Sequence, residues 1–148
     1  MTHAAFSSPD IDDDFVLWLE RQIELIRERQ FAHLDIDNLV EELDVIVSSR
    51  RKALRTRLAV LTSHLLKCEY QPALKSNSWI RTICTQRNAI DRLIEQSPSL
   101  APQILSAARH EYDRALRQAA KETSLPKSAF PGELPYTEQQ LLDFDFIP

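Results

Sequence analysis

The chain has 148 residues, of which 43% are hydrophobic and 27% charged, values typical of one soluble globular domain. It contains one glycine, Gly132, where average usage of roughly 7% predicts about ten. Glycine provides the positive-φ residues of hairpins and phosphate-binding loops. Its scarcity therefore argues against a β-rich fold and against a glycine-rich nucleotide site.

The sequence has no run of about 18 apolar residues, so no transmembrane helix is expected. The segment from Met1 to Asp14 is acidic and lacks the cationic and apolar regions of a signal peptide. Two cysteines, Cys68 and Cys84, are too few for a disulfide framework. We therefore expect a cytoplasmic protein with a flexible N-terminus over residues 1–11 and a single helical domain over residues 12–148.

The net charge of −4 is unevenly distributed. Residues 1–49 contain three basic and twelve acidic side chains, a net charge of −9. Residues 50–92 contain ten basic and two acidic side chains, a net charge of +8, and residues 93–148 carry −3. The middle third is thus a cationic block between two anionic flanks. Either the flanks neutralise this block within the fold, or it meets an anion from outside.

The first predicted helix runs from Phe15 to about Gln30, where apolar residues recur with a helical period. An acidic cluster, residues 12–14, precedes it and suits the positive end of the helix dipole. Gln22 falls on the face that we expect to be buried. Residues 31–35 are expected to form a short connection.

The second predicted helix is the longest. Apolar residues follow steps of three and four from Ile36 to Leu65, and no glycine or proline interrupts residues 36–71. We expect roughly 33 residues of helix, about 50 Å, with Asp37 as N-cap and a bend at Ser48-Ser49. Two helices joined at this serine pair are the alternative. Pro72 ends the segment because proline cannot donate the next helical hydrogen bond.

Two further main helices are predicted. One begins near Ser76 and continues to Ile94, and the other begins at Ser97-Pro98 and runs to about Thr123. A proline-rich strap follows, with Phe130 and Tyr136 expected to pin it. Thr137 and Gln140 make a capping box for a short last helix to about residue 143, after which Phe144, Phe146 and Ile147 should dock. The fold class is therefore all-α: a bundle of four main helices plus a short C-terminal helix and a strap.

The cationic stretch Arg50–Arg57 allows three interpretations. It can pair with acidic residues of the same or a neighbouring chain, bind a phosphate-bearing partner, or form a solvated face. Binding of phosphates would make affinity depend on salt. The acidic sequence pI of about 5.6 and the absence of a zinc-finger or RRM signature favour charge pairing, within the fold or in an oligomer.

A second group of polar residues occurs where the long helix ends. His64, Lys67 and Gln71 are spaced i, i+3 and i+7 and so share one face of it. A neutral imidazole beside a lysine can act as a general base, but no serine or aspartate stands at an offset that would complete a catalytic set. A structural polar network that fixes the helix register explains the same residues.

His64 and Cys68 are spaced i, i+4, and Cys84 could add a third metal ligand. Such pairs arise often by chance, and no Cys-x-x-Cys or His-Glu-x-x-His motif supports a site. We therefore expect no metal and no cofactor.

The chain carries an ordered series of short motifs: Asn38-Leu39-Val40-Glu41-Glu42, Arg57-Leu58, His64-Leu65-Leu66-Lys67, Tyr70-Gln71-Pro72, Ser78-Trp79, Thr82-Ile83, Gln86-Arg87, Ser97-Pro98-Ser99-Leu100, Glu122-Thr123, Phe130-Pro131 and Pro135-Tyr136. In this order and spacing, from about Phe15 to Pro148, they resemble the bacterial family catalogued as domain of unknown function 29. The resemblance implies an all-helical bundle and no established activity. Cys68 departs from the family pattern, which more usually has tryptophan there, so a thiol metal site would be peculiar to this chain.

The motif positions supply the candidate site residues: Glu41, Glu42, Arg57, His64, Lys67, Tyr70, Gln71, Trp79 and Arg87. The same positions would be expected if these residues only hold the long helix against its neighbours.

We expect a protein-interaction or oligomerisation module without catalysis, with a protein partner or a second copy of the chain. One alternative is a small enzyme or ligand-binding protein in which His64 is the base and Lys67 and Arg87 hold an anion. Another is a nucleic-acid-linked regulator such as a toxin–antitoxin component. Nucleic acid is the less favoured partner, and no membrane association is expected.

Overall fold

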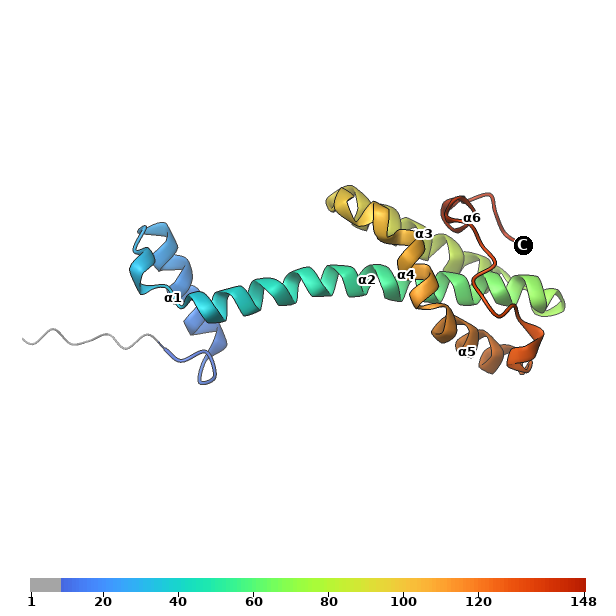
Figure 1. The fold of residues 1–148 in the computed structure, drawn as a ribbon, viewed down its shortest axis with the longest axis horizontal. Helices are drawn as coiled ribbons and strands as arrows, with labels where there is room; N and C mark the ends of the chain where they lie inside the picture. Colours follow the sequence, from blue (N-terminus) through green and yellow to red (C-terminus); the bar gives the residue numbers. More distant parts are fainter. Residues whose placement is uncertain (1–8) are drawn as a thin grey trace, which may run out of the picture. The chain divides into compact units, whose positions relative to one another are not determined.

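The structure is a computed structural model that describes residues 9–148, in which six α-helices, four 3₁₀ helices and no strand occur (Figure 1). The expectation of an all-α fold is confirmed. No helix in this part of the chain has the length and hydrophobicity needed to cross a bilayer. Residues 1–8, most of the expected flexible N-terminus, lie outside the described residues.

The contacts divide the chain into two units, Met1–Val47 and Ser48–Pro148, which we call unit 1 and unit 2 and describe separately. Helix α2 contributes its first part to unit 1 and its second part to unit 2. The boundary falls at Ser48, inside one continuous helix, so two separate helices joined at the serine pair are excluded, and a bend there stays a prediction. The expectation of a single domain from residue 12 onward stays a prediction.

Unit 1 begins with α1, Phe15–Arg27, whose N-cap is Asp14. The Asp14 carboxylate accepts a hydrogen bond from the backbone N–H of Leu17 at 2.9 Å. The helix ends earlier than the expected Gln30, because Arg29 adopts a left-handed φ of 57° that an α-helix cannot continue through. The 3₁₀ helix η1, Phe31–His33, then connects α1 to α2.

Helix α2 runs from Ile36 to Tyr70, 35 residues, close to the predicted length. The prediction of Asp37 as N-cap is wrong, since Asp37 lies inside the first turn. Pro72 follows the helix and opens the 3₁₀ helix η2, Pro72–Leu74. The long helix therefore ends where the loss of a backbone donor requires it.

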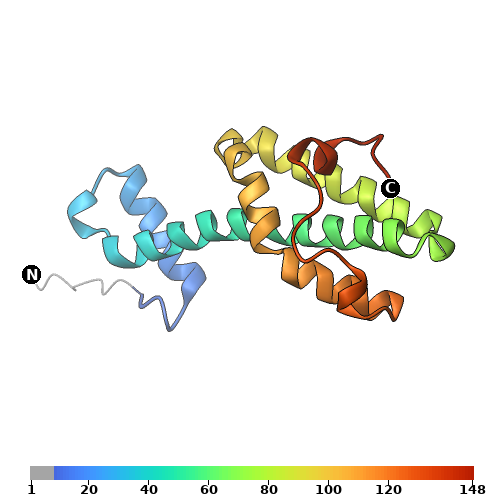
Figure 2. The same ribbon diagram turned by 45° about the vertical axis from the view of Figure 1, so that its right-hand side comes forward.

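Unit 2 is built around the second part of α2. Helices α3 (Asn77–Gln96), α4 (Ile104–His110), α5 (Tyr112–Thr123) and α6 (Glu138–Leu142) gather around it (Figure 2). Leu54, Leu58, Leu61 and Leu65 of α2 are each at most 1% exposed and belong to one hydrophobic core with residues of all these helices. This core positions the polar groups described below.

The predicted fourth helix is interrupted. Its first turns form the 3₁₀ helix η3, Pro98–Gln103, and α4 and α5 are separated at Glu111, whose φ and ψ are −89° and 0°. The following residue, Tyr112, is 5% exposed, and its hydroxyl donates a hydrogen bond to Pro131 O at 2.6 Å. Tyr112 thus ties the helix break to the strap. Periodicity does not reveal the break because apolar residues continue through it.

The C-terminal region follows the expectation in most respects. Phe130 and Tyr136 of the strap are 6% and 5% exposed, with the 3₁₀ helix η4 (Lys127–Ala129) between α5 and Phe130. The capping box of Thr137 and Gln140 starts α6. Phe146 packs against the core as expected, whereas Phe144 is 40% exposed and does not dock.

The two parts of α2 should respond differently to the same truncation. Leu61→Ala should lower the free energy of unfolding by about 2–5 kcal/mol because it leaves a cavity in the core of unit 2. Leu43→Ala, at a residue that is 60% exposed, should change it by less than about 0.5 kcal/mol. Urea denaturation followed by circular dichroism measures both, and equal losses would contradict the assignment of the core.

Candidate functional site

Three of the predicted site residues come together in unit 2 around Lys67. Its side chain is 3% exposed, and Nζ lies 3.3 Å from His64 Nε2 and 4.7 Å from the centroid of the Trp79 ring. Nζ also donates a hydrogen bond to the Glu122 carboxylate, which accepts another from Gln118. We call these five residues the Lys67 cluster.

The hydrogen bonds fix the tautomer of His64. Nδ1 lies 2.9 Å from the carbonyl oxygen of Val60, which can only accept, so Nδ1 carries the proton. The lone pair of Nε2 then accepts from the Lys67 ammonium group. Both ring nitrogens of His64 are therefore engaged, and the lone pair that a general base needs points to a cation.

The cluster is electrostatically consistent with a neutral imidazole. Burial lowers the pKa of His64, and Lys67 lowers it further, against the opposing effects of the Val60 carbonyl and Glu122. Burial tends to raise the pKa of Glu122, but the hydrogen bonds from Lys67 and Gln118 and the charges of Lys67 and His64 together leave this pKa below its ordinary value. The ionised Glu122 thus balances the buried ammonium group of Lys67.

A pocket of about 230 Å³ lies beside the cluster, between α2 and α5. His64, Gln118 and Glu122 line it together with Ser63 and Arg114. The first three are already bonded within the cluster, whereas Ser63 Oγ finds no hydrogen-bond partner among residues 9–148. This arrangement can hold α2 and α5 in register, and it offers no unoccupied base.

Arg87 lies apart from this cluster. It is fully buried in α3, and its Nε and Nη2 donate to the carbonyl oxygens of Leu141 (2.8 Å) and Gln140 (2.9 Å). Burial lowers the pKa of its guanidinium group. These carbonyls lie at the C-terminal end of α6, where the helix dipole favours a cation. The structure therefore does not bring Arg87 to His64 and Lys67, as the enzyme hypothesis requires. Arg87 instead holds α6 against α3 through these two hydrogen bonds, a contact that we call the Arg87 clamp.

The remaining predicted residues are dispersed. Arg57 donates to Gln86 Oε1 at 3.4 Å, and the Tyr70 ring packs against Phe130 with centroids 5.4 Å apart. Gln71 is half-buried after the end of α2. In unit 1, Glu41 is exposed and Glu42 is half-buried.

The cationic block finds part of its counter-charge within unit 2. Arg55 Nε lies 4.0 Å from Glu111, and Lys67 pairs with Glu122, so two of its cations meet the acidic C-terminal flank. Arg50 donates to Gln96 at 2.8 Å. Arg51 and Lys52 are exposed.

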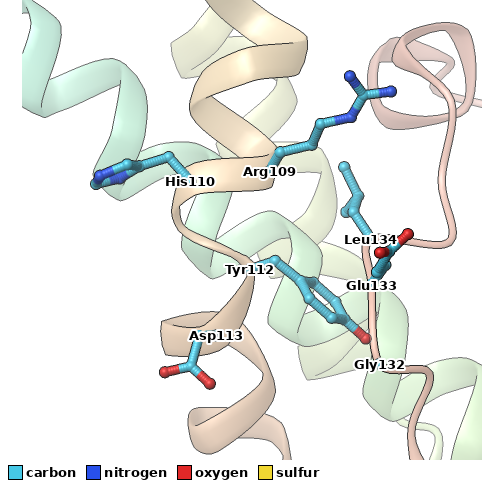
Figure 3. Close-up of a pocket in the computed structure, with 7 residues that line it drawn as sticks. All are labelled: Arg109, His110, Tyr112, Asp113, Gly132, Glu133 and Leu134. Carbon is cyan, nitrogen blue, oxygen red and sulfur yellow. The ribbon is translucent and has the colours of Figure 1, made fainter.

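A larger pocket, of about 510 Å³, lies between the α4–α5 junction and the strap. Figure 3 shows the Tyr112 ring pointing towards the strap at Gly132, whereas His110 and Asp113 point away. The polar side chains that line this pocket therefore do not converge on one point. Over residues 9–148 there is also no group of His, Cys, Asp or Glu that could hold a metal ion.

Sequence reasoning missed Glu122, the counter-charge of Lys67. The signal was present, because Glu122-Thr123 is one of the ordered motifs. Periodicity alone could not connect it to Lys67, which lies 55 residues earlier.

Arg87→Met should lower the free energy of unfolding by about 2–4 kcal/mol, because it removes two hydrogen bonds from a charged donor and leaves two carbonyls unpaired. Arg92→Met, at an exposed residue of the same helix, should cost less than about 0.5 kcal/mol. Urea denaturation tests both changes. A small effect of Arg87→Met would show that α6 docks without this clamp.

His64 should make stability fall on acidification. Its folded-state pKa is lowered, so below about pH 6.5 the unfolded chain binds the proton more readily than the folded chain does. The free energy of unfolding should therefore decrease from about pH 7 to pH 5.5 and do so less steeply in His64→Gln. His110→Gln, at a side chain that is 72% exposed, is the control and should keep the wild-type slope. Identical slopes for all three proteins would rule out the buried neutral imidazole.

Comparison with known proteins gives one match. The model of the family described as "Domain of unknown function DUF29" matches residues 11–147 and confirms the resemblance carried by the ordered motifs. No curated protein and no solved structure matches the chain.

Proposed function

Since the chain belongs to the DUF29 family, whose description assigns no function, we propose from its structure that it is a protein-interaction module. In this proposal unit 1 binds a basic amphipathic helix of another protein. The observation that carries it is the amount of apolar surface that unit 1 leaves uncovered.

Fourteen large hydrophobic side chains are exposed over residues 9–148, and twelve of them belong to unit 1. Only Leu74 and Phe144 belong to unit 2. Within unit 1, the buried face of α1 comprises Trp18, Gln22 and Leu25. Apolar surface concentrated in this way marks an interaction site more often than chance exposure does.

Seven of these exposed residues, together with the half-buried Leu19, form two rows with helical spacing. The α1 row consists of Phe15, Leu19, Ile23 and Ile26, and the α2 row consists of Ile36, Val40, Leu43 and Val47. All four members of the α2 row are between 47% and 60% exposed. Steps of three and four place each row on one face of its helix, the pattern by which a helix receives another helix.

The charge of unit 1 selects the partner. Its described residues include twelve acidic and three basic side chains, a net charge of −9. Glu41, Glu42 and Asp44 alternate with the members of the α2 row along the helix. A symmetric contact with unit 1 of a second copy would bring two such surfaces together, and like charges oppose this. A partner helix with apolar and basic faces satisfies both the rows and the charge.

The test uses a fluorescein-labelled helical peptide with leucine at heptad positions a and d and lysine elsewhere, titrated with the full chain and followed by anisotropy. Val40→Gln should weaken binding about fivefold, since it removes an apolar contact of the α2 row. Val45→Gln is the matched control, because Val45 is 56% exposed on the same helix and lies outside the row. It should leave binding unchanged.

Three outcomes would overturn the proposal. One is equal weakening by Val40→Gln and Val45→Gln, and another is equally tight binding of a peptide with glutamate in place of lysine. The third is a concentration-dependent dimer in sedimentation velocity that Val40→Gln abolishes, which would assign the α2 row to a second copy.

A further inference from the structure

A pocket of about 570 Å³ in unit 1 is separate from the Lys67 cluster and combines acidic and buried polar groups. Asp10, Asp13 and Asp35 line it, together with Trp18, Gln22, His33 and Asn38. Its volume is in the range of pockets that hold a small molecule or a large side chain.

The carboxylate of Asp35 is held in place from two sides. Trp18 Nε1 and Asn38 Nδ2 donate to the same oxygen, Oδ2, at 3.0 and 2.8 Å. The hydrogen bonds from Asn38 and Trp18 lower the pKa of Asp35, so it is ionised at neutral pH. A hydrogen bond from the Asn38 backbone also lowers this pKa, and the carboxylate keeps further lone pairs that the donors of an occupant can use.

Gln22 gives a second, independent indication. It is 1% exposed, and its Oε1 accepts from the backbone N–H of Asp35 at 2.8 Å. Its amide nitrogen, Nε2, finds no hydrogen-bond partner among residues 9–148. A buried N–H group without an acceptor is unfavourable and rare, so an occupant whose acceptor reaches Nε2 through a small shift of the Gln22 side chain would be stabilised here.

These groups define the chemistry of the occupant. The carboxylates require a cationic donor, and Gln22 requires an acceptor. A metal ion does not suit this site, because it offers no acceptor to Gln22. The acidic side chains of the described residues also form no group that could hold one. An arginine residue of a polypeptide offers both parts: a planar guanidinium group that pairs with carboxylates, and a backbone carbonyl oxygen.

We propose that this pocket binds an arginine residue of the partner, with the guanidinium group on Asp35, Asp10 and Asp13 and the partner's carbonyl oxygen on Gln22 Nε2. This inference rests on the proposed function, because it names the residue through which a basic partner is anchored to unit 1.

The test is a titration of the full ¹⁵N-labelled chain with N-acetyl-L-argininamide, followed by NMR. The indole N–H of Trp18 donates to Asp35 and reports on the pocket, whereas that of Trp79 in unit 2 is an internal reference. The Trp79→Phe variant assigns the two signals. The Trp18 signal should shift saturably with N-acetyl-L-argininamide and stay unmoved by N-acetyl-L-citrullinamide, a neutral analogue of the same shape.

Variants locate the binding. Asp35→Asn should weaken it at least about tenfold, because it removes the charge and retains an acceptor for Trp18. Asp13→Asn, at an exposed carboxylate of the pocket rim, should weaken it about threefold even if Asp35→Asn perturbs the local fold. Glu20→Gln, at an exposed acidic residue of α1 outside the pocket, is the matched control and should change it less than twofold, within about 0.4 kcal/mol.

Equal shifts with the citrulline analogue, or equal weakening by Asp13→Asn and Glu20→Gln, would overturn the inference. The lysine–leucine peptide of the preceding test contains no arginine and therefore separates the two proposals. If this peptide binds and N-acetyl-L-argininamide does not, the arginine pocket fails and the proposed function stands. If only N-acetyl-L-argininamide binds, the pocket stands and the proposed helical partner fails.

Discussion

The hydrophobic side chains spaced along α2 are stabilised when other side chains cover them. Unit 2 covers its part of α2, and unit 1 leaves its part largely exposed. From Leu54 to Leu65 the α2 side chains that face the core are at most 1% exposed, because α3, α4, α5 and the strap pack on them. From Ile36 to Val47 the same spacing continues, but the α2 row is about half exposed. Burial of a large apolar side chain contributes about 1.5–3 kcal/mol, so unit 1 gains stability from any partner that covers its rows.

Two buried cations organise the polar interior of unit 2. Lys67 has a carboxylate, an imidazole and an aromatic face around it, and Arg87 has the two carbonyls at the end of α6. Removing one partner of such a group is costly, which ties α5 and α6 to the rest of the unit. The motif residues His64, Lys67, Trp79 and Arg87 thus all have partners in the fold, and only Nη1 of Arg87 has none among residues 9–148.

Much of the local structure follows from the sequence. The absence of glycine and proline between Ile36 and Gln71, with Pro72 beyond, defines α2 to within a few residues. The helical period also places Gln22 on the buried face of α1, where it is found. The break at Glu111 escaped prediction because it is stabilised by a tertiary hydrogen bond from Tyr112 to the strap and not by a local signal.

The candidate site was less predictable. Spacing on α2 correctly paired His64 with Lys67, since both lie on one helix. It could not show that Glu122 completes the cluster or that Arg87 turns to α6, because these contacts join residues more than 50 positions apart. Periodicity likewise identifies apolar rows but does not show which elements pack on them. Packing is the reason why Leu61 is buried and Leu43 is exposed.

Amide hydrogen exchange along α2 in the isolated chain tests this difference directly. Slow exchange over residues 54–66, together with fast exchange over residues 40–47, is the result that a covered row in unit 2 and an uncovered row in unit 1 require. Equally slow exchange over both stretches would mean that the chain covers its own N-terminal row, and the interaction surface would then not exist.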